Sequence, residues 1–133
     1  MTMASEAELL ALGDRVVNEK ATDALTMAII ELDYHTPGGI GLGVNYDPLM
    51  WMERYGADPL TSADSAMAII PAGWFTRFAA EDRHSGSWRW ELRGGYGWNV
   101  GVRAPTQAQA ITAAALHAHA VVARAAAMEV NHD

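Results

Sequence analysis

Two Asp-x-His pairs are the residues best suited to acid–base chemistry in this sequence. Asp33 precedes His35 by two positions, and Asp82 precedes His84 by the same interval. A histidine oriented by a carboxylate is a common general base. Both pairs fall in segments expected to be loops, where polar residues are also common without a catalytic role. A small hydrolase-like enzyme using Asp33, His35 and Asp82 is therefore one alternative.

Other motifs for catalysis, cofactors or metals are incomplete. The segment 38–43 is rich in glycine, but a dinucleotide fingerprint starting at Gly39 needs a glycine where Val44 stands. His117 and His119 are two residues apart on an expected helix, so they point about 200° apart and cannot hold one ion. The chain has no cysteine, which excludes thiolate sites and disulfides. We predict no catalytic, cofactor-binding or metal-binding residue.

Four arginines are spaced to share one face of a predicted sheet. Residues 74–79, 88–93 and 98–103 alternate between large apolar and polar side chains, which predicts an antiparallel meander. The arginines on its polar face are Arg77, Arg89, Arg93 and Arg103. Such a group can bind phosphates or an acidic partner segment. Phe75 is the only aromatic residue predicted there, so the face lacks the stacking surface of a single-strand binder.

The opposite face of these strands is predicted to be buried. Its large residues include Trp74, Phe78, Trp88, Trp90 and Trp98. We expect all five indole rings of the chain to lie inward, beneath the alanine-rich helix that follows. The arginine face is then either solvated or covered by acidic N-terminal helices. A sandwich with helices on both faces of the sheet predicts the covered form.

A long alanine-rich helix is predicted after the third strand. Pro105 ends that strand, and Thr106 with Gln109 forms a capping box. The helix runs to about Met128 and has a broad stripe of small residues suited to lying close on a sheet. Leu116 lies about 140° from the centre of this stripe. We therefore expect Leu116 to be exposed, as a candidate contact in a homodimer or with another partner.

Capping patterns place shorter helices in the first half of the chain. Ser5 and Glu8 form a capping box, and Thr22 or Asp23 can start a second helix. Gly56 is a predicted helix stop. The predicted helices cover about residues 6–18, 23–32, 49–55 and 63–70.

Acidic residues concentrate in the same half. The net charge is −7, and residues 1–64 hold 11 of the 16 acids. The net charge disfavours nucleic acid as a partner for the whole surface. The acidic half either pairs with the nearly neutral second half within one fold or forms a surface for a basic partner. The acids of the first helix are the predicted contacts: Glu6, Glu8, Asp14 and Glu19.

No segment is expected to enter a membrane. Residues 1–12 lack the basic and apolar regions of a signal peptide. The longest apolar tract, 108–128, is interrupted by Thr112, His117, His119 and Arg124. These features predict a cytoplasmic protein.

The predicted fold is α+β. A three- to four-stranded antiparallel meander carries a long C-terminal helix, with N-terminal helices packed on it. We expect one domain over residues 1–133, with an N-terminal helical part at 1–32 and an α-β-β-β-α core at 59–130.

One stretch is similar to a known kind of protein. Residues 59–74, PLTSADSAMAIIPAGW, resemble a segment of small phage and prophage proteins in which a helix ends in proline and glycine before a tryptophan. Those proteins continue with tryptophan-rich strands and an alanine-rich helix opened by a Thr/Pro pair, which 104–106 approaches in reversed order. Residues 8–16, ELLALGDRV, resemble their first helix. The similarity departs around 18–32 and is least at 33–58.

The sequence thus resembles the phage ABA-sandwich domain family, which has no assigned biochemical activity. The resemblance implies a fold and a phage origin, and it transfers no catalytic residue. It favours a non-enzymatic, phage- or prophage-encoded accessory protein that binds a host or phage protein in the bacterial cytoplasm.

A sharper hypothesis is an inhibitor of a host defence complex of the CRISPR type, in which the acidic half imitates nucleic-acid charge. The alternatives are the small enzyme described above and a nucleic-acid binder that uses the arginine face.

Overall fold

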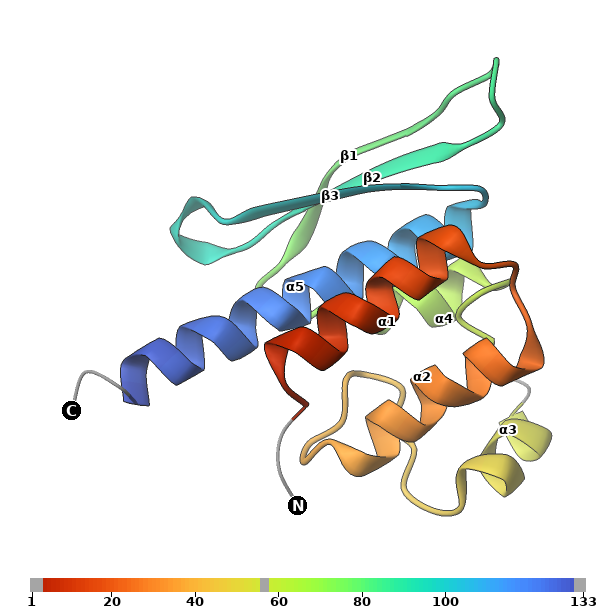
Figure 1. Cartoon of the computed structure of the whole chain (residues 1–133), viewed down its shortest axis with the longest axis vertical. Helices are drawn as coiled ribbons and strands as arrows, with labels where there is room; N and C mark the ends of the chain where they lie inside the picture. The colour runs from red at the N-terminus through yellow and green to blue at the C-terminus, as the bar shows by residue number, and fades with distance from the viewer. Residues whose placement is uncertain (1–3, 56–57, 131–133) are drawn as a thin grey trace.

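The computed structural model describes residues 4–55 and 58–130 (Figure 1). In chain order its elements are α1 (Glu6–Asn18), α2 (Asp23–His35), α3 (Pro48–Tyr55), α4 (Ala63–Met67), β1 (Phe75–Glu81), β2 (Trp88–Arg93), the 3-10 turn η1 (Gly95–Gly97), β3 (Asn99–Ala104) and α5 (Gln107–Val130). The α+β class, the antiparallel sheet and the long C-terminal helix with N-terminal helices packed on it are confirmed. The predicted stop at Gly56 lies outside the described residues.

The helices begin where side chains can cap them. The Ser5 hydroxyl accepts the Glu8 N–H at 3.1 Å, and the Glu8 carboxylate accepts the Ser5 N–H at 3.3 Å, which completes the capping box of α1. Thr22 caps α2 by accepting the Leu25 N–H. Helix α4 is shorter than predicted, because the chain after Met67 continues in three-residue turns rather than α-helical ones.

The sheet is the predicted meander, in the order β1-β2-β3, but β1 contains a bulge. Thr76 pairs with Leu92, whereas Phe78 pairs with Glu91, so Arg77 is an extra residue without a cross-strand partner. The bulge shifts the alternation by one position. Phe78 therefore lies on the outer face with Glu91, and the prediction that it is buried is wrong.

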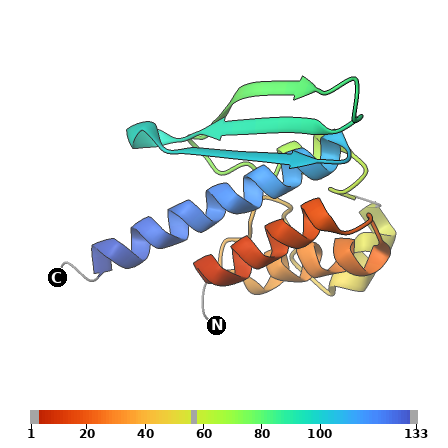
Figure 2. The same ribbon diagram turned by 45° about the horizontal axis from the view of Figure 1, so that its top comes forward.

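The helices lie on one side of the sheet (Figures 1 and 2). Helix α5 crosses the inner face, contacting β2 and β3, and α1 packs along α5. Helices α2 and α3 form the layer farthest from the sheet. No helix of the described residues covers the outer face, so of the two forms expected for the arginine face the structure has the solvated one and not the covered one. The physical reason is that α1 buries its apolar stripe against α5 instead.

Helix α5 is buried on all sides over its first half. Leu116 has no exposed surface and packs in one cluster with Leu9, Leu12 and Val16 of α1. Its predicted exposure is wrong, because α1 covers the side of α5 that faces away from the sheet. Over Gln107–Met128, α5 is also long and apolar enough to cross a membrane, but this first half is occupied by contacts with the sheet, α1 and α4.

The tryptophans are divided among several environments. Trp90 is buried beneath α5, while Trp74 and Trp88 are half-buried at the margins of the same cluster. Trp98 is 37% exposed, and Trp51 packs in a separate cluster with Ile30 and Val44. The expectation that all five rings lie beneath α5 is therefore wrong for Trp51 and Trp98.

Candidate functional site: the outer face of the sheet

Two arginines face each other at the centre of the outer sheet face. Arg89 on β2 pairs directly with Arg103 on β3, so their side chains leave the sheet on the same face as neighbours. Both side chains are more than half exposed, at 53% and 55%. Like charges directly opposite one another on a sheet are unfavourable unless an anion lies near them.

The chain neutralises these charges only weakly. Arg89 lies 3.4 Å from the Glu91 carboxylate, and Arg103 lies 3.4 Å from that of Asp82. Ion pairs at such distances on an exposed surface contribute little. Arg93 lies on the same face, opposite Asn99, and within the described residues it makes no ion pair or side-chain hydrogen bond.

The Asp82 carboxylate takes part in a second interaction besides its ion pair with Arg103. It accepts the His84 N–H at 2.9 Å, and this hydrogen bond is the main cause that lowers the pKa of Asp82. The carboxyl therefore organises the β1–β2 turn as well as approaching Arg103.

Two exposed phenylalanines share this face with the arginines. Phe75 pairs with Arg93 and is 55% exposed, and Phe78 pairs with Glu91 and is 45% exposed. The Arg89 guanidinium lies over the Phe78 ring, 5.8 Å from its centroid. The alternation of residues 74–79 predicts Phe78 on the buried face, because nothing in it signals a bulge.

Arg77 does not extend the arginine group as predicted. It is exposed, but it is the unpaired residue of the bulge, so strand alternation does not assign it to the outer face. The structure thus brings together three of the four predicted arginines: Arg89, Arg93 and Arg103. We call these arginines, with Phe75 and Phe78, the Arg–Phe face.

Charge is divided between the sheet and the helices. Residues 75–104 carry five arginines and three acids, a net charge of +2, which leaves −9 on the rest of the chain. Because the helices lie beyond the inner face, the Arg–Phe face looks away from most of the acids. The molecule is therefore polarised, and the outer face is its basic end.

The four acids predicted as contacts on the first helix do not form one surface. Successive helical residues turn by about 100°, so Glu8 lies about 160° around α1 from Glu6. Glu8 caps the helix, Glu19 pairs with Arg15 at 2.8 Å, and Asp14 lies 3.5 Å from His117. These local contacts occupy much of the predicted acidic patch.

The Asp33 carboxylate has a structural role in the loop that follows α2. It is buried, and its two carboxylate oxygens accept the backbone N–H groups of Ile40, Leu42 and Val44 at 2.7 to 3.0 Å. A carboxylate that accepts three such bonds holds its loop in place.

The other residues of the enzyme alternative are dispersed. His35 is exposed at the end of α2 against the Tyr34 ring, and Asp82 lies in the turn after β1, on the other side of α5. The structure does not bring Asp33, His35 and Asp82 into one site.

His119 of α5 is half-buried near this loop. Its Nε2 atom lies 2.7 Å from the carbonyl oxygen of Ile69, just beyond α4. Burial lowers the pKa of His119, against the opposing effects of the Ile69 and Ile40 carbonyls and of the Asp33 charge.

We expect the free energy of unfolding to fall as the pH drops below the ordinary histidine pKa of 6.5. In this range the unfolded chain protonates His119 while the folded chain resists, so stability is complete above pH 6.5 and is lost toward the lower folded-state pKa. Urea unfolding at several pH values measures this. His119→Gln keeps a hydrogen-bond donor for the Ile69 carbonyl and should flatten the pH dependence of the free energy of unfolding. An equal slope of this free energy against pH in both proteins would contradict the role of His119.

Within residues 4–55 and 58–130, no three His, Asp or Glu side chains are grouped so that they could hold a metal ion. No family model, no curated protein and no solved structure matches the chain. The function must therefore be inferred from the geometry of the described residues.

Proposed function

We propose that the protein is a non-enzymatic accessory protein of a phage or prophage that acts in the bacterial cytoplasm by binding another protein through its Arg–Phe face. The phage origin rests on the resemblance of residues 59–74 and 8–16. The observation that carries the binding role is an open sheet face on which three arginines lack strong partners and two phenylalanines are exposed.

The chemistry of this face suits an acidic segment with apolar residues. Arginine binds carboxylates in a planar, two-point geometry, and its guanidinium also packs on aromatic rings. Exposed phenylalanines beside arginines supply apolar contact area, and both aromatic residues and arginine are enriched in protein interfaces.

A protein partner is favoured over nucleic acid by the charge of the whole molecule. Outside residues 75–104 the chain carries −9, which would repel a long phosphate backbone that extends past the sheet. Glu91, in the middle of the face, would also repel phosphates, whereas a protein segment can offer it a donor. The second ring, Phe78, favours a single-stranded nucleic acid as the alternative partner, because bases stack on such rings and the arginines beside it can bind phosphates.

Charge reversal tests this proposal. A labelled acidic peptide with alternating glutamates and leucines should bind, and the triple variant Arg89→Glu/Arg93→Glu/Arg103→Glu should lose at least about ten-fold in affinity. Binding should also weaken between about 50 and 300 mM salt, since exposed charges are screened. Fluorescence anisotropy measures both.

A matched control makes the same charge change elsewhere. Arg15→Glu/Arg54→Glu/Arg124→Glu should bind the peptide much better than the face variant. Equal losses in the two triple variants would mean that net charge, and not this face, governs binding. A short single-stranded DNA that binds more tightly than the peptide would assign the face to nucleic acid.

The hypothesis of an acidic inhibitor makes a different prediction. Reversing Glu6, Glu8, Asp14 and Glu19 to lysine should abolish affinity for a basic host defence complex if α1 imitates nucleic-acid charge. Binding that survives all four reversals would reject those residues as its source.

A further inference from the structure

A second surface feature lies on the opposite side of the molecule from the Arg–Phe face. A cleft of about 430 Å³ opens between the glycine-rich loop after α2, helix α3 and helix α4. This volume is within the range of small-molecule sites. The cleft takes no part in the function proposed above.

The walls of this cleft are held in place by buried contacts. Asp33 binds alternate amides of the loop, at Ile40, Leu42 and Val44. Gly41 lies so close to the end of α4 that a Cβ atom there would be 2.0 Å from the Ala68 carbonyl oxygen. Its φ of 114° is also one that glycine adopts without strain. The cleft is therefore formed before any ligand arrives.

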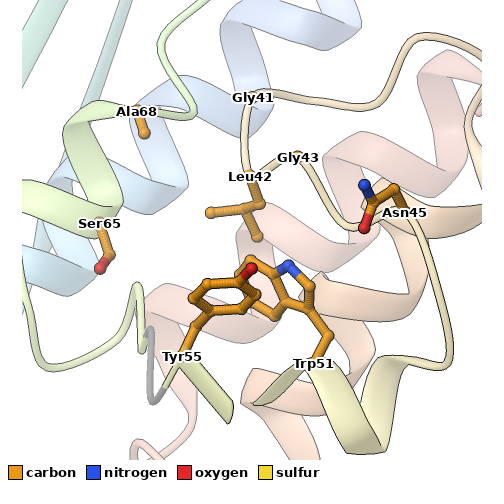
Figure 3. A pocket seen from close by; sticks show the side chains of 8 residues that line it. All are labelled: Gly41, Leu42, Gly43, Asn45, Trp51, Tyr55, Ser65 and Ala68. Atoms are coloured by element: carbon orange, nitrogen blue, oxygen red, sulfur yellow. The ribbon is translucent and has the colours of Figure 1, made fainter.

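Two aromatic rings and an aliphatic side chain line the interior (Figure 3). Trp51 is buried, and the ring of Tyr55 lies 5.4 Å from it at a tilt of 48°. Tyr55 is 58% exposed, so its ring is accessible to a stacking partner. Arg54 lies over the Tyr55 ring, 5.7 Å from its centroid, without lining the cleft.

Polar groups stand on either side of the rings. Figure 3 shows Ser65 on one side and Asn45 on the other, with Tyr55 and Leu42 between them. Within the described residues, the Asn45 amide and the hydroxyls of Ser65 and Tyr55 make no hydrogen bond. None of the residues lining the cleft is charged.

We propose that this cleft binds a neutral, planar heteroaromatic ring with donor and acceptor groups on its edge, the chemistry of a nucleobase. The uncharged lining disfavours an anion, and the exposed ring of Tyr55 favours a flat partner. An asparagine amide pairs with an edge that carries a donor beside an acceptor, as adenine does. The free nucleoside is the expected source of the base, because the negative charge outside the sheet repels a phosphate backbone. An unpaired base of a nucleic-acid strand is the other source.

Titration of the full chain with adenosine, guanosine, cytidine and uridine, followed by NMR chemical shifts, tests the proposal. At least one nucleoside should bind and shift the signals of Tyr55 and Asn45. Tyr55→Ala and Asn45→Ala should each weaken this binding about ten-fold or more. Tyr34→Ala, at another exposed helical tyrosine, should leave it unchanged and serves as the matched control.

Each remaining outcome decides the question. Failure of all four nucleosides to bind overturns the proposal, as does ribose alone binding equally well. Binding of N-acetyltryptophanamide without any nucleoside replaces the nucleobase with an aromatic side chain. Short oligonucleotides that bind more tightly than their nucleosides identify a strand as the source, and equal affinities identify the free nucleoside.

These outcomes are separate from those for the Arg–Phe face. The charge reversals at Arg89, Arg93 and Arg103 alter no residue of the cleft. They should therefore leave nucleoside binding unchanged, whether or not the acidic peptide binds.

Discussion

Replacing Asp33 with alanine should lower the free energy of unfolding by at least about 3 kcal/mol. The substitution leaves the N–H groups of Ile40, Leu42 and Val44 without their acceptor, and each buried unsatisfied group costs about 1–3 kcal/mol. Small domains are stable by only about 5–15 kcal/mol. Urea unfolding measures the loss, and hydrogen exchange should show lost protection at these three amides.

Two variants bracket this prediction. Asp33→Asn keeps one carbonyl oxygen and should fall between wild type and Asp33→Ala. Asp47→Ala removes an exposed carboxylate that accepts a single N–H, from Leu49, and should cost no more than about 1 kcal/mol. If Asp33→Ala is no less stable than Asp47→Ala, Asp33 does not organise the loop, and the enzyme alternative regains its main candidate.

Replacing Leu116 with alanine should lower the free energy of unfolding by about 2–5 kcal/mol. The side chain is fully buried between α5 and α1, and its removal leaves a cavity beside Leu9, Leu12 and Val16. The packed helices cannot collapse into that space without moving the sheet or α1. Calorimetry or urea unfolding measures the loss.

Val122 provides the control on the same helix. It lies two turns toward the C-terminus of α5 and is 39% exposed, so Val122→Ala should change stability by less than about 1 kcal/mol. A dimer contact at Leu116 predicts the reverse of a core role: unchanged monomer stability and a concentration-dependent loss of association. Such a result would contradict the buried position of Leu116 and support a contact at the surface.

Local signals in the sequence determined where most elements begin. The Ser5–Glu8 box and Thr22 mark helix starts because the capping atoms lie within three residues of the amides they bind. The strands were equally predictable from alternation, since successive side chains point to opposite faces. From the same alternation Arg89, Arg93 and Arg103 could be assigned to one face.

These local signals could not predict hydrogen bonds between residues that are far apart in the chain. The Thr106 hydroxyl accepts the Gln109 backbone N–H, which is one half of the predicted capping box. The Gln109 side chain does not complete the box: its oxygen accepts the Thr106 hydroxyl, and its nitrogen donates to the carbonyls of Val16 and Glu19, across some ninety residues. Likewise, Asp33 looked like half of a catalytic pair because its three amide partners follow it in an irregular loop. Hydrogen bonds between distant or irregularly spaced residues produce no periodic pattern in the sequence, so they cannot be predicted from it.

The elements and the polarity of their faces follow from the order of the residues, because they depend on neighbours a few positions away. Packing of the whole chain is needed to explain why a bulge brings Phe78 beside the arginines, why α1 covers α5 instead of the sheet, and why a loop, α3 and α4 enclose a cleft. The reason is that the packing of helices and sheet depends on the contact area between whole surfaces. Which apolar stripe is buried against which neighbour depends on the summed contact area and on backbone close approaches such as Gly41 against Ala68.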